Sequence, residues 1–205
     1  MKEEFYMTDK QLAVQCIQML EKYLNEVKNL PNNNSKMLTL AGSDMTEWKN
    51  TYYPQLVQSG KIRDGAFFQN PLKDFRYGIG NDGVCTKLEY LQFLWSAYQF
   101  VLGDFPSSNE SLKCIKNCIK MLEPYAADFQ NQGTGVSISR DLKSTDMTEW
   151  KNEYYPKLSK PGLVPDASYF ANGAHLGIGN DGRFVAEELC HFLFRLYRQA
   201  YIILN

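Results

Sequence analysis

Acidic side chains are the residues of this sequence that come nearest to a catalytic set. Asp44 with Glu47, and Asp82 with Glu89, could form carboxylate pairs that move protons in a hydrolase. The Asp44–Glu47 spacing also suits a helix N-cap and its partner, and an Asp there accepts bonds from the free amides of the first turn. We therefore expect helix capping and solvated surface as the main uses of these carboxylates.

Other catalytic motifs are missing from the sequence. The two histidines, His175 and His191, do not form a His-x-x-x-His pair. No Gly-x-Ser-x-Gly motif places a serine on a nucleophile elbow. A carboxylate-dependent hydrolase that uses Asp82 and Glu89 is therefore kept only as an alternative function.

A glycine-rich pattern, Gly-Ile-Gly-Asn-Asp-Gly, occurs twice, at residues 78–83 and 177–182. It matches the fingerprint of dinucleotide-binding sites, which requires a strand before it and a βαβ unit after it. Only 23 residues follow the second copy, and their pattern is helical. We therefore predict a tight turn, because Asn-Asp-Gly favours positive φ and side-chain-to-backbone bonds. The polar residues of these turns remain a candidate loop site: Asn81, Asp82, Asn180 and Asp181.

The sequence offers two weak indications of a metal site. The glycine-rich segments place an aspartate, a glycine and a glutamate at positions 5, 6 and 12 of a calcium loop, but positions 1 and 3 are glycines instead of carboxylates. Cys114 and Cys118 lie four residues apart on a predicted helix, yet no second ligand pair stands near them at zinc spacing. We expect no metal and no cofactor.

Most of the chain consists of one pattern that occurs twice. Asp44–Leu56 returns as Asp146–Leu158 with eleven of thirteen positions identical, at an offset of 102 residues. Cys16–Tyr23 returns as Cys118–Tyr125 at that offset, whereas the glycine-rich turns are offset by 99. We predict two tandem copies, residues 1–103 and 104–205. The linker Gly103–Pro106 is too short for independent domains, so we expect one body with a pseudo-two-fold axis.

Three helices are predicted in each copy. The first begins at Thr8, with Gln11 as its capping-box partner, and continues to Pro31. Its counterpart is predicted to begin at Ser107, with Glu110 as the partner. The third helices cover residues 86–102 and 185–204, and they are apolar around much of their circumference, which predicts a central position.

The second helix of each copy lies in the repeated segment itself. Asp44 and Asp146 are its predicted N-caps, and Pro54 and Pro156 are predicted to kink or stop it after two or three turns. Residues 37–40 and 136–138 could form short strands, so short β-hairpins could occur in the long loops. The predicted fold is mainly α, with two copies of a three-helix unit of about 100 residues.

Charge and apolar patterning limit the classes of partner. Lys and Arg number 22 and Asp and Glu 23, and each half is balanced, which excludes the basic excess that nucleic-acid binding requires. No apolar run is long enough to span a membrane, and no secretory signal follows Met1. The five cysteines match large apolar residues or each other in the two copies, so we expect buried thiols in a cytoplasmic protein.

Aromatic residues of the repeated segment suggest a surface for another protein. Tyr and Trp dominate interface hot spots, and we expect Trp48 and Trp150 in the core and the Tyr-Tyr-Pro corners partly exposed. The candidate protein-binding residues are Lys49, Tyr52, Tyr53, Lys151, Tyr154 and Tyr155.

The first hypothesis for function is a protein-binding module, of the inhibitor or immunity type that binds and blocks a partner such as a toxin or enzyme. A ligand-binding or regulatory protein is the second, with a site at the seam between the copies that the glycine-rich turns would line. The hydrolase is the third. The sequence does not predict the oligomeric state.

Overall fold

The structure is a computed structural model that describes residues 7–30, 37–62, 79–131, 139–159, 164 and 178–205. In these residues the chain is mainly helical, with short antiparallel strand pairs. This agrees with the prediction of a mainly α fold with short strand pairs. The strand predicted at residues 136–138 lies outside the described residues.

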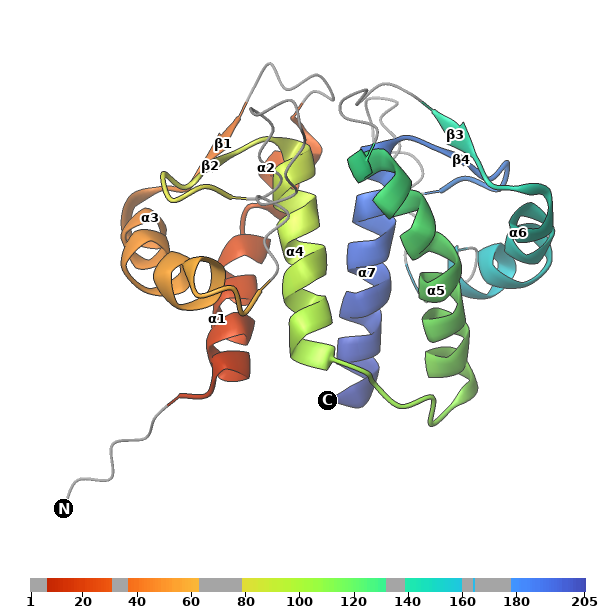
Figure 1. Ribbon diagram of the computed structural model, residues 1–205, viewed down its shortest axis with the longest axis horizontal. Coiled ribbons are helices and arrows are strands. Elements are labelled where there is room, and N and C mark those ends of the chain that lie inside the picture. The colour runs from red at the N-terminus through yellow and green to blue at the C-terminus, as the bar shows by residue number, and fades with distance from the viewer. Residues whose placement is uncertain (1–6, 31–36, 63–78, 132–138, 160–163, 165–177) are drawn as a thin grey trace.

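Four long helices stand side by side and form the body of the molecule (Figure 1). They are α1 (Asp9–Glu21), α4 (Lys87–Leu102), α7 (Ala186–Leu204) and α5 (Glu110–Asn131), in that order across the view. The central pair, α4 and α7, pack on each other, α1 packs on α4, and α5 packs on α7. The third predicted helices are therefore central, as their apolar circumference indicates.

Smaller elements flank each side of this row (Figure 1). On one side, α2 (Leu24–Lys28) leads to β1 (Leu38–Thr39), α3 (Gly42–Glu47) and η1 (Trp48–Gln58), and β1 pairs antiparallel with β2 (Val84–Cys85). On the other side, β3 (Arg140–Asp141) pairs with β4 (Arg183–Phe184), and α6 (Ser144–Glu149) continues into η3 (Trp150–Ser159). The strand predicted at residues 37–40 is confirmed in β1.

Capping boxes start two of the helices as the sequence predicts. The Thr8 hydroxyl accepts from the Gln11 N–H at 3.3 Å, and the Gln11 side chain accepts from the Thr8 N–H at 2.8 Å. Thr86 and Glu89 repeat this arrangement at the start of α4. Val185 has no hydroxyl, so α7 keeps only the second half of the box, in which Glu188 accepts from the Val185 N–H at 2.8 Å.

Two helix boundaries differ from the prediction. The helix expected to run from Thr8 to Pro31 divides into α1 and α2, because the Tyr23 N–H bonds the Leu20 carbonyl, three residues back, at 2.9 Å. The start predicted at Ser107 is wrong. Helix α5 begins at Glu110, and the Asn109 side chain accepts from the Leu112 N–H at 2.8 Å.

Tyrosine hydroxyls, and not the predicted aspartates, accept the hydrogen bonds of backbone N–H groups at the starts of α3 and α6. Both helices begin before Asp44 and Asp146, so these aspartates are not N-caps. Instead, the Ala41 N–H donates to the Tyr23 hydroxyl at 3.0 Å, and that hydroxyl donates to Asp44 at 2.9 Å. On the other side the Lys143 N–H donates to the Tyr125 hydroxyl at 2.8 Å, and Tyr125 donates to Asp146. Tyr125 thus ties α5 to α6, and Tyr23, which lies between α1 and α2, ties that junction to α3.

Beyond these starts the helix widens into the π-helices η1 and η3, in which an N–H bonds the carbonyl five residues earlier. Pro54 and Pro156 lie inside them, so of the predicted kink or stop, the stop is wrong. Proline is disfavoured inside an α-helix, because its ring meets the carbonyl four residues earlier. A wider turn moves that carbonyl aside, and the helix continues.

The repeated tryptophans form the core between flank and body. Trp48 and Trp150 are fully buried. Trp48 meets the Phe93 ring of α4 edge-on, with 5.3 Å between ring centroids, and Trp150 meets Phe192 of α7 in the same way at 5.4 Å. T-shaped pairs add about 0.5–1.5 kcal/mol beyond the area they bury. These pairs hold η1 on α4 and η3 on α7.

Two glutamates connect the sides of the molecule reciprocally. Glu21 of α1 accepts from Tyr98 of α4 at 3.0 Å and from Arg198 of α7 at 2.7 Å. Glu123 of α5 accepts from Tyr197 of α7 at 2.7 Å and from Gln99 of α4 at 3.2 Å. Each outer helix is thus bonded both to its adjacent central helix and to the more distant one.

The tyrosine ties predict a stability effect. Tyr23→Phe and Tyr125→Phe each leave a helix-start N–H and a partly buried aspartate without their common partner, so unfolding free energy should fall by about 1–2 kcal/mol in each variant. Urea denaturation of the full chain measures this. Tyr53→Phe is the control, because the Tyr53 hydroxyl has no hydrogen bond to the described residues. Equal stability of all three variants would contradict the prediction.

Candidate functional site

The Asn-Asp-Gly segments form the predicted tight turns. The Gly83 N–H donates to the Gly80 carbonyl at 2.9 Å, and the Asp82 carboxylate accepts from the Val84 N–H at 3.2 Å. The second turn repeats both bonds, at 3.0 Å to Gly179 and at 3.1 Å to Asp181. Gly83 and Gly182 have φ of +70° and +69°, which strains residues with a Cβ. Gly78 and Gly177 lie outside the described residues.

Each turn is fixed to the core by a tryptophan. The Trp48 indole N–H donates to the Gly80 carbonyl at 2.9 Å, and the Trp150 indole donates to the Gly179 carbonyl at 2.9 Å. A buried indole N–H needs such a partner. Sequence analysis identified the tryptophan-containing repeat and the glycine-rich turns separately. It did not predict that the tryptophans hold the turns in position.

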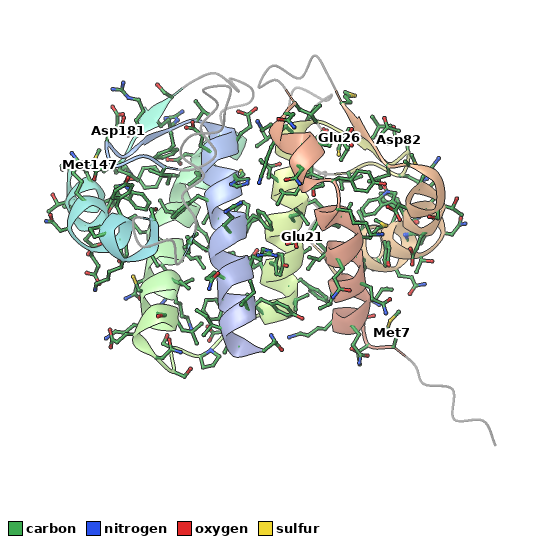
Figure 2. All side chains as sticks on the ribbon, turned by 180° about the vertical axis from the view of Figure 1, so that it is seen from behind. Met7, Glu21, Glu26, Asp82, Met147 and Asp181 are labelled. Atoms are coloured by element: carbon green, nitrogen blue, oxygen red, sulfur yellow. The ribbon has the colours of Figure 1, made fainter. Side chains whose placement is uncertain are left out.

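The two turns do not converge on one site. Asp82 and Asp181 are exposed and lie on opposite flanks of the molecule (Figure 2). Asn81 and Asn180 are exposed beside them. The four candidate loop residues therefore form two separate groups, and they do not line a common pocket at the seam between α4 and α7.

The carboxylates considered for catalysis accept hydrogen bonds that hold the fold together. Asp44 accepts from the Tyr23 hydroxyl and Glu47 from the Tyr52 hydroxyl at 3.0 Å, while Glu89 caps α4. Across the part of the chain that the structure describes, no three His, Cys, Asp or Glu side chains gather as a metal site. The five cysteines are free and buried, and burial raises the pKa of the Cys16 and Cys118 thiols well above the ordinary range.

The candidate protein-binding residues divide by exposure. Lys49 and Lys151 are exposed. Tyr53 and Tyr155 are half-buried, because their rings lean on the indoles of Trp48 and Trp150, at centroid distances of 6.1 Å and 5.9 Å. Tyr52 and Tyr154 are buried, with 3% and 5% of their surface exposed, so they contribute to the core and not to a surface.

Buried ionisable groups gather where the N-terminal parts of α4 and α7 meet. Lys87 and Glu187 are 3% and 2% exposed, and His191 is fully buried with its ring edge-on to Phe194. The Lys87 ammonium donates to the Leu30 carbonyl at 3.4 Å. Burial raises the pKa of Glu187 to about 8, although the Lys87 charge opposes that rise. His175 lies outside the described residues.

An open groove of about 620 Å³ lies between α1 and the C-terminal ends of α4 and α7. Val14 of α1, Val101 of α4 and Tyr201 of α7 provide apolar lining. The face of α1 adds four polar side chains to the lining: Lys10, Gln11, Gln15 and Gln18. Met7, which also lines the groove and is labelled in Figure 2, lies just before the first turn of α1. Met7 and Ile202 are among the large apolar side chains that remain exposed, at 45% and 49%.

The groove was not predicted from the sequence. Its lining comes from residues 7–18, 101 and 201–205, which are far apart along the chain. The strongest indication of the groove in the sequence is the row of Gln11, Gln15 and Gln18 on one face of α1. An exposed helical face usually carries charged side chains, whereas this face carries neutral amides.

Comparison of the chain with models of protein families, with curated protein sequences and with solved structures gave no match. Among the described helices, none combines the length and the apolar character needed to cross a bilayer.

The buried carboxyl predicts a pH effect on stability. The pKa of Glu187 is near 4.5 in an unfolded chain and about 8 in the folded one, so folding favours the protonated acid. The stabilisation is complete below pH 4.5 and is lost as the pH rises toward 8. Glu187→Gln removes this dependence. The free energy of unfolding of the variant, relative to that of the parent, should therefore increase by on the order of 2–4 kcal/mol as the pH rises from 5 to 8.5.

Urea denaturation at several pH values tests this expectation. Asp128→Asn is the matched control, because Asp128 is an exposed carboxylate on α5. The control should follow the parent at every pH. Parallel stability curves for Glu187→Gln and the parent would contradict the prediction, because they would show that the pKa of Glu187 is the same in the folded and unfolded chains.

Proposed function

We propose that the chain is a protein-binding module that covers a functional surface of its partner, as inhibitors and immunity-type antidotes do. The observation that carries this proposal is the open groove between α1, α4 and α7. Its apolar lining, its row of amides and its exposed Met7 resemble the mixed surface that protein partners bury. Exposed Lys49 and Lys151 provide further polar contacts on the flanks.

We further propose that residues 1–103 and 104–205 are duplicated copies that form one body about a pseudo-two-fold axis. The reciprocal glutamate bonds support this arrangement, because Glu21 and Glu123 match at an offset of 102, and their partners Tyr98 and Tyr197 match at 99. The groups that reach across, Arg198 and Gln99, also occupy matched positions. A two-fold arrangement produces such pairs of equivalent contacts.

The observations favour the binding function over the two alternatives. A hydrolase would need accessible carboxylates near one another, whereas Asp82 and Asp181 lie on opposite flanks and Glu89 caps a helix. A ligand site at the seam would need the turns beside α4 and α7, yet both turns lie at the outer edges. The groove, by contrast, is open and borders three helices.

Site-specific photo-crosslinking in the cells that produce the chain tests this function. A benzoyl-phenylalanine at Gln15, in the groove, should give one crosslinked product with a protein partner. The matched control is Asn117, which is exposed at the equivalent position of α5, 102 residues later. Purified chain should then block the partner's activity at an equimolar ratio.

The proposed function fails if the chain carrying the crosslinker at position 15 is recovered alone. Crosslinking with equal efficiency at positions 15 and 117 would also contradict it, because the groove would then have no special role.

A further inference from the structure

The polar lining of the open groove is almost entirely neutral. Gln11, Gln15 and Gln18 line it from α1, and Lys10 is the one charged side chain among the described lining residues. The Gln11 carbonyl oxygen serves the capping box, whereas Gln15 and Gln18 are exposed and make no hydrogen bond within the described part of the chain. An amide both donates and accepts, so this row can bond to an identical row on another molecule.

The corresponding face of α5 has a different charge. Positions 102 residues after Gln11, Val14 and Gln18 are all lysines: Lys113, Lys116 and Lys120. Lys116 bonds Asp104, whereas Lys113 and Lys120 are exposed. Two α5 faces placed together would bring these ammonium groups opposite one another, and like charges repel. The α1 face is free of that repulsion, so it can meet its own copy where the α5 face cannot.

Apolar side chains give the groove surface that a partner molecule could bury. Met7, Val14, Val101 and Tyr201 contribute to the lining, and Met7 is 45% exposed. The other three are half-buried, so each keeps apolar surface in contact with water. Covering such surface is favourable, and a mixture of apolar area and hydrogen-bonding groups is typical of protein interfaces.

We infer that a second copy of the chain covers the groove about a two-fold axis that passes near Gln15, perpendicular to α1. Both copies then use the same surface, as in the commonest class of protein dimer. Contact between this face and the α5 face of another copy is less favourable, because the described lining residues include no acidic side chain to pair with the lysines. Asp9, in the first turn of α1, already bonds Lys61 at 2.6 Å.

The lysine of the groove does not oppose this contact. A two-fold axis perpendicular to α1 makes the two copies of α1 antiparallel. Lys10 lies five residues before Gln15 on this helix, so the two Lys10 side chains stand on opposite sides of the axis, about 15 Å apart along the helices. Exposed charges at that separation are largely screened at physiological ionic strength.

The dimer has a consequence for the proposed function. With the groove covered by a second copy, a partner protein binds there only after the two copies separate. Self-association therefore regulates access to the groove. This consequence rests on the proposed protein-binding function, whereas the dimer itself does not.

Analytical ultracentrifugation of the full chain, from micromolar to millimolar concentration, tests the dimer. The parent should change reversibly from monomer to dimer as its concentration rises. Gln15→Lys and Gln15→Glu should each weaken the dimer at least about tenfold, because two like charges then meet near the axis. Asn117→Lys is the control, because Asn117 is exposed at the equivalent position of α5, and it should leave the dimer unchanged.

A mixture of the two Gln15 variants separates a charge contact from damage to the fold. Opposite charges meet near the axis when one copy carries Gln15→Lys and the other Gln15→Glu, so an equal mixture should dimerise about as tightly as the parent. Labelling one variant with nitrogen-15 allows native mass spectrometry to identify the mixed dimer. Each variant alone should retain the circular dichroism spectrum of the parent.

Three results would overturn the inference. The first is a parent that stays monomeric over the whole concentration range. If removal of residues 1–6 then produced a dimer, the chain's own N-terminal segment would be the occupant of the groove. The second is a dimer that neither Gln15 variant weakens, because its interface would lie elsewhere. The third is a mixture of the two variants that stays as monomeric as each variant alone.

The crosslinker at position 15 separates this inference from the proposed function. A product with the mass of two chains contains a second copy, whereas any other mass contains a different partner. A monomeric chain that crosslinks to a different protein would support the function and refute the dimer. A dimer without any other crosslinked protein would support the inference and refute the function.

Discussion

The packing of α4 against α7 is the constraint on which the rest of the structure depends. Both helices are buried around most of their circumference, so each requires cover on several sides. Helices α1 and α5 cover the outer faces, and η1 and η3 add the tryptophans that pack on Phe93 and Phe192. The strand pairs and turns then follow, because the indoles fix the carbonyls of Gly80 and Gly179.

Much of this fold could be predicted because its signals are local. Capping boxes at Thr8 and Thr86, the apolar third helices and the Asn-Asp-Gly turns depend on residues a few positions apart. The starts of α3 and α6 could not be predicted, because Tyr23 and Tyr125 reach them from 18 residues away. The helix continues through Pro54 as a π-helix, a rare conformation that the sequence pattern did not predict.

The candidate site shows the same division. The repeat drew attention to residues that match, and many of these have structural roles: Tyr52 and Tyr154 are buried in the core, and the exposed aspartates of the turns bond the backbone. The groove was missed because it depends on residues that do not match. Its lining residues come from α1 and from the C-terminal ends of α4 and α7, which are far apart along the chain.

The buried charges at the centre follow this logic too. Lys87 of α4 and Glu187 of α7 interact electrostatically, whereas the positions that match them, Ala186 and Leu88, are apolar. Burying both charges is costly, because each loses its hydration and the carboxyl is driven toward its neutral form. A symmetric apolar contact would avoid that cost but would not distinguish one side from the other. The ionisable pair therefore makes the two ends of the α4–α7 contact chemically different.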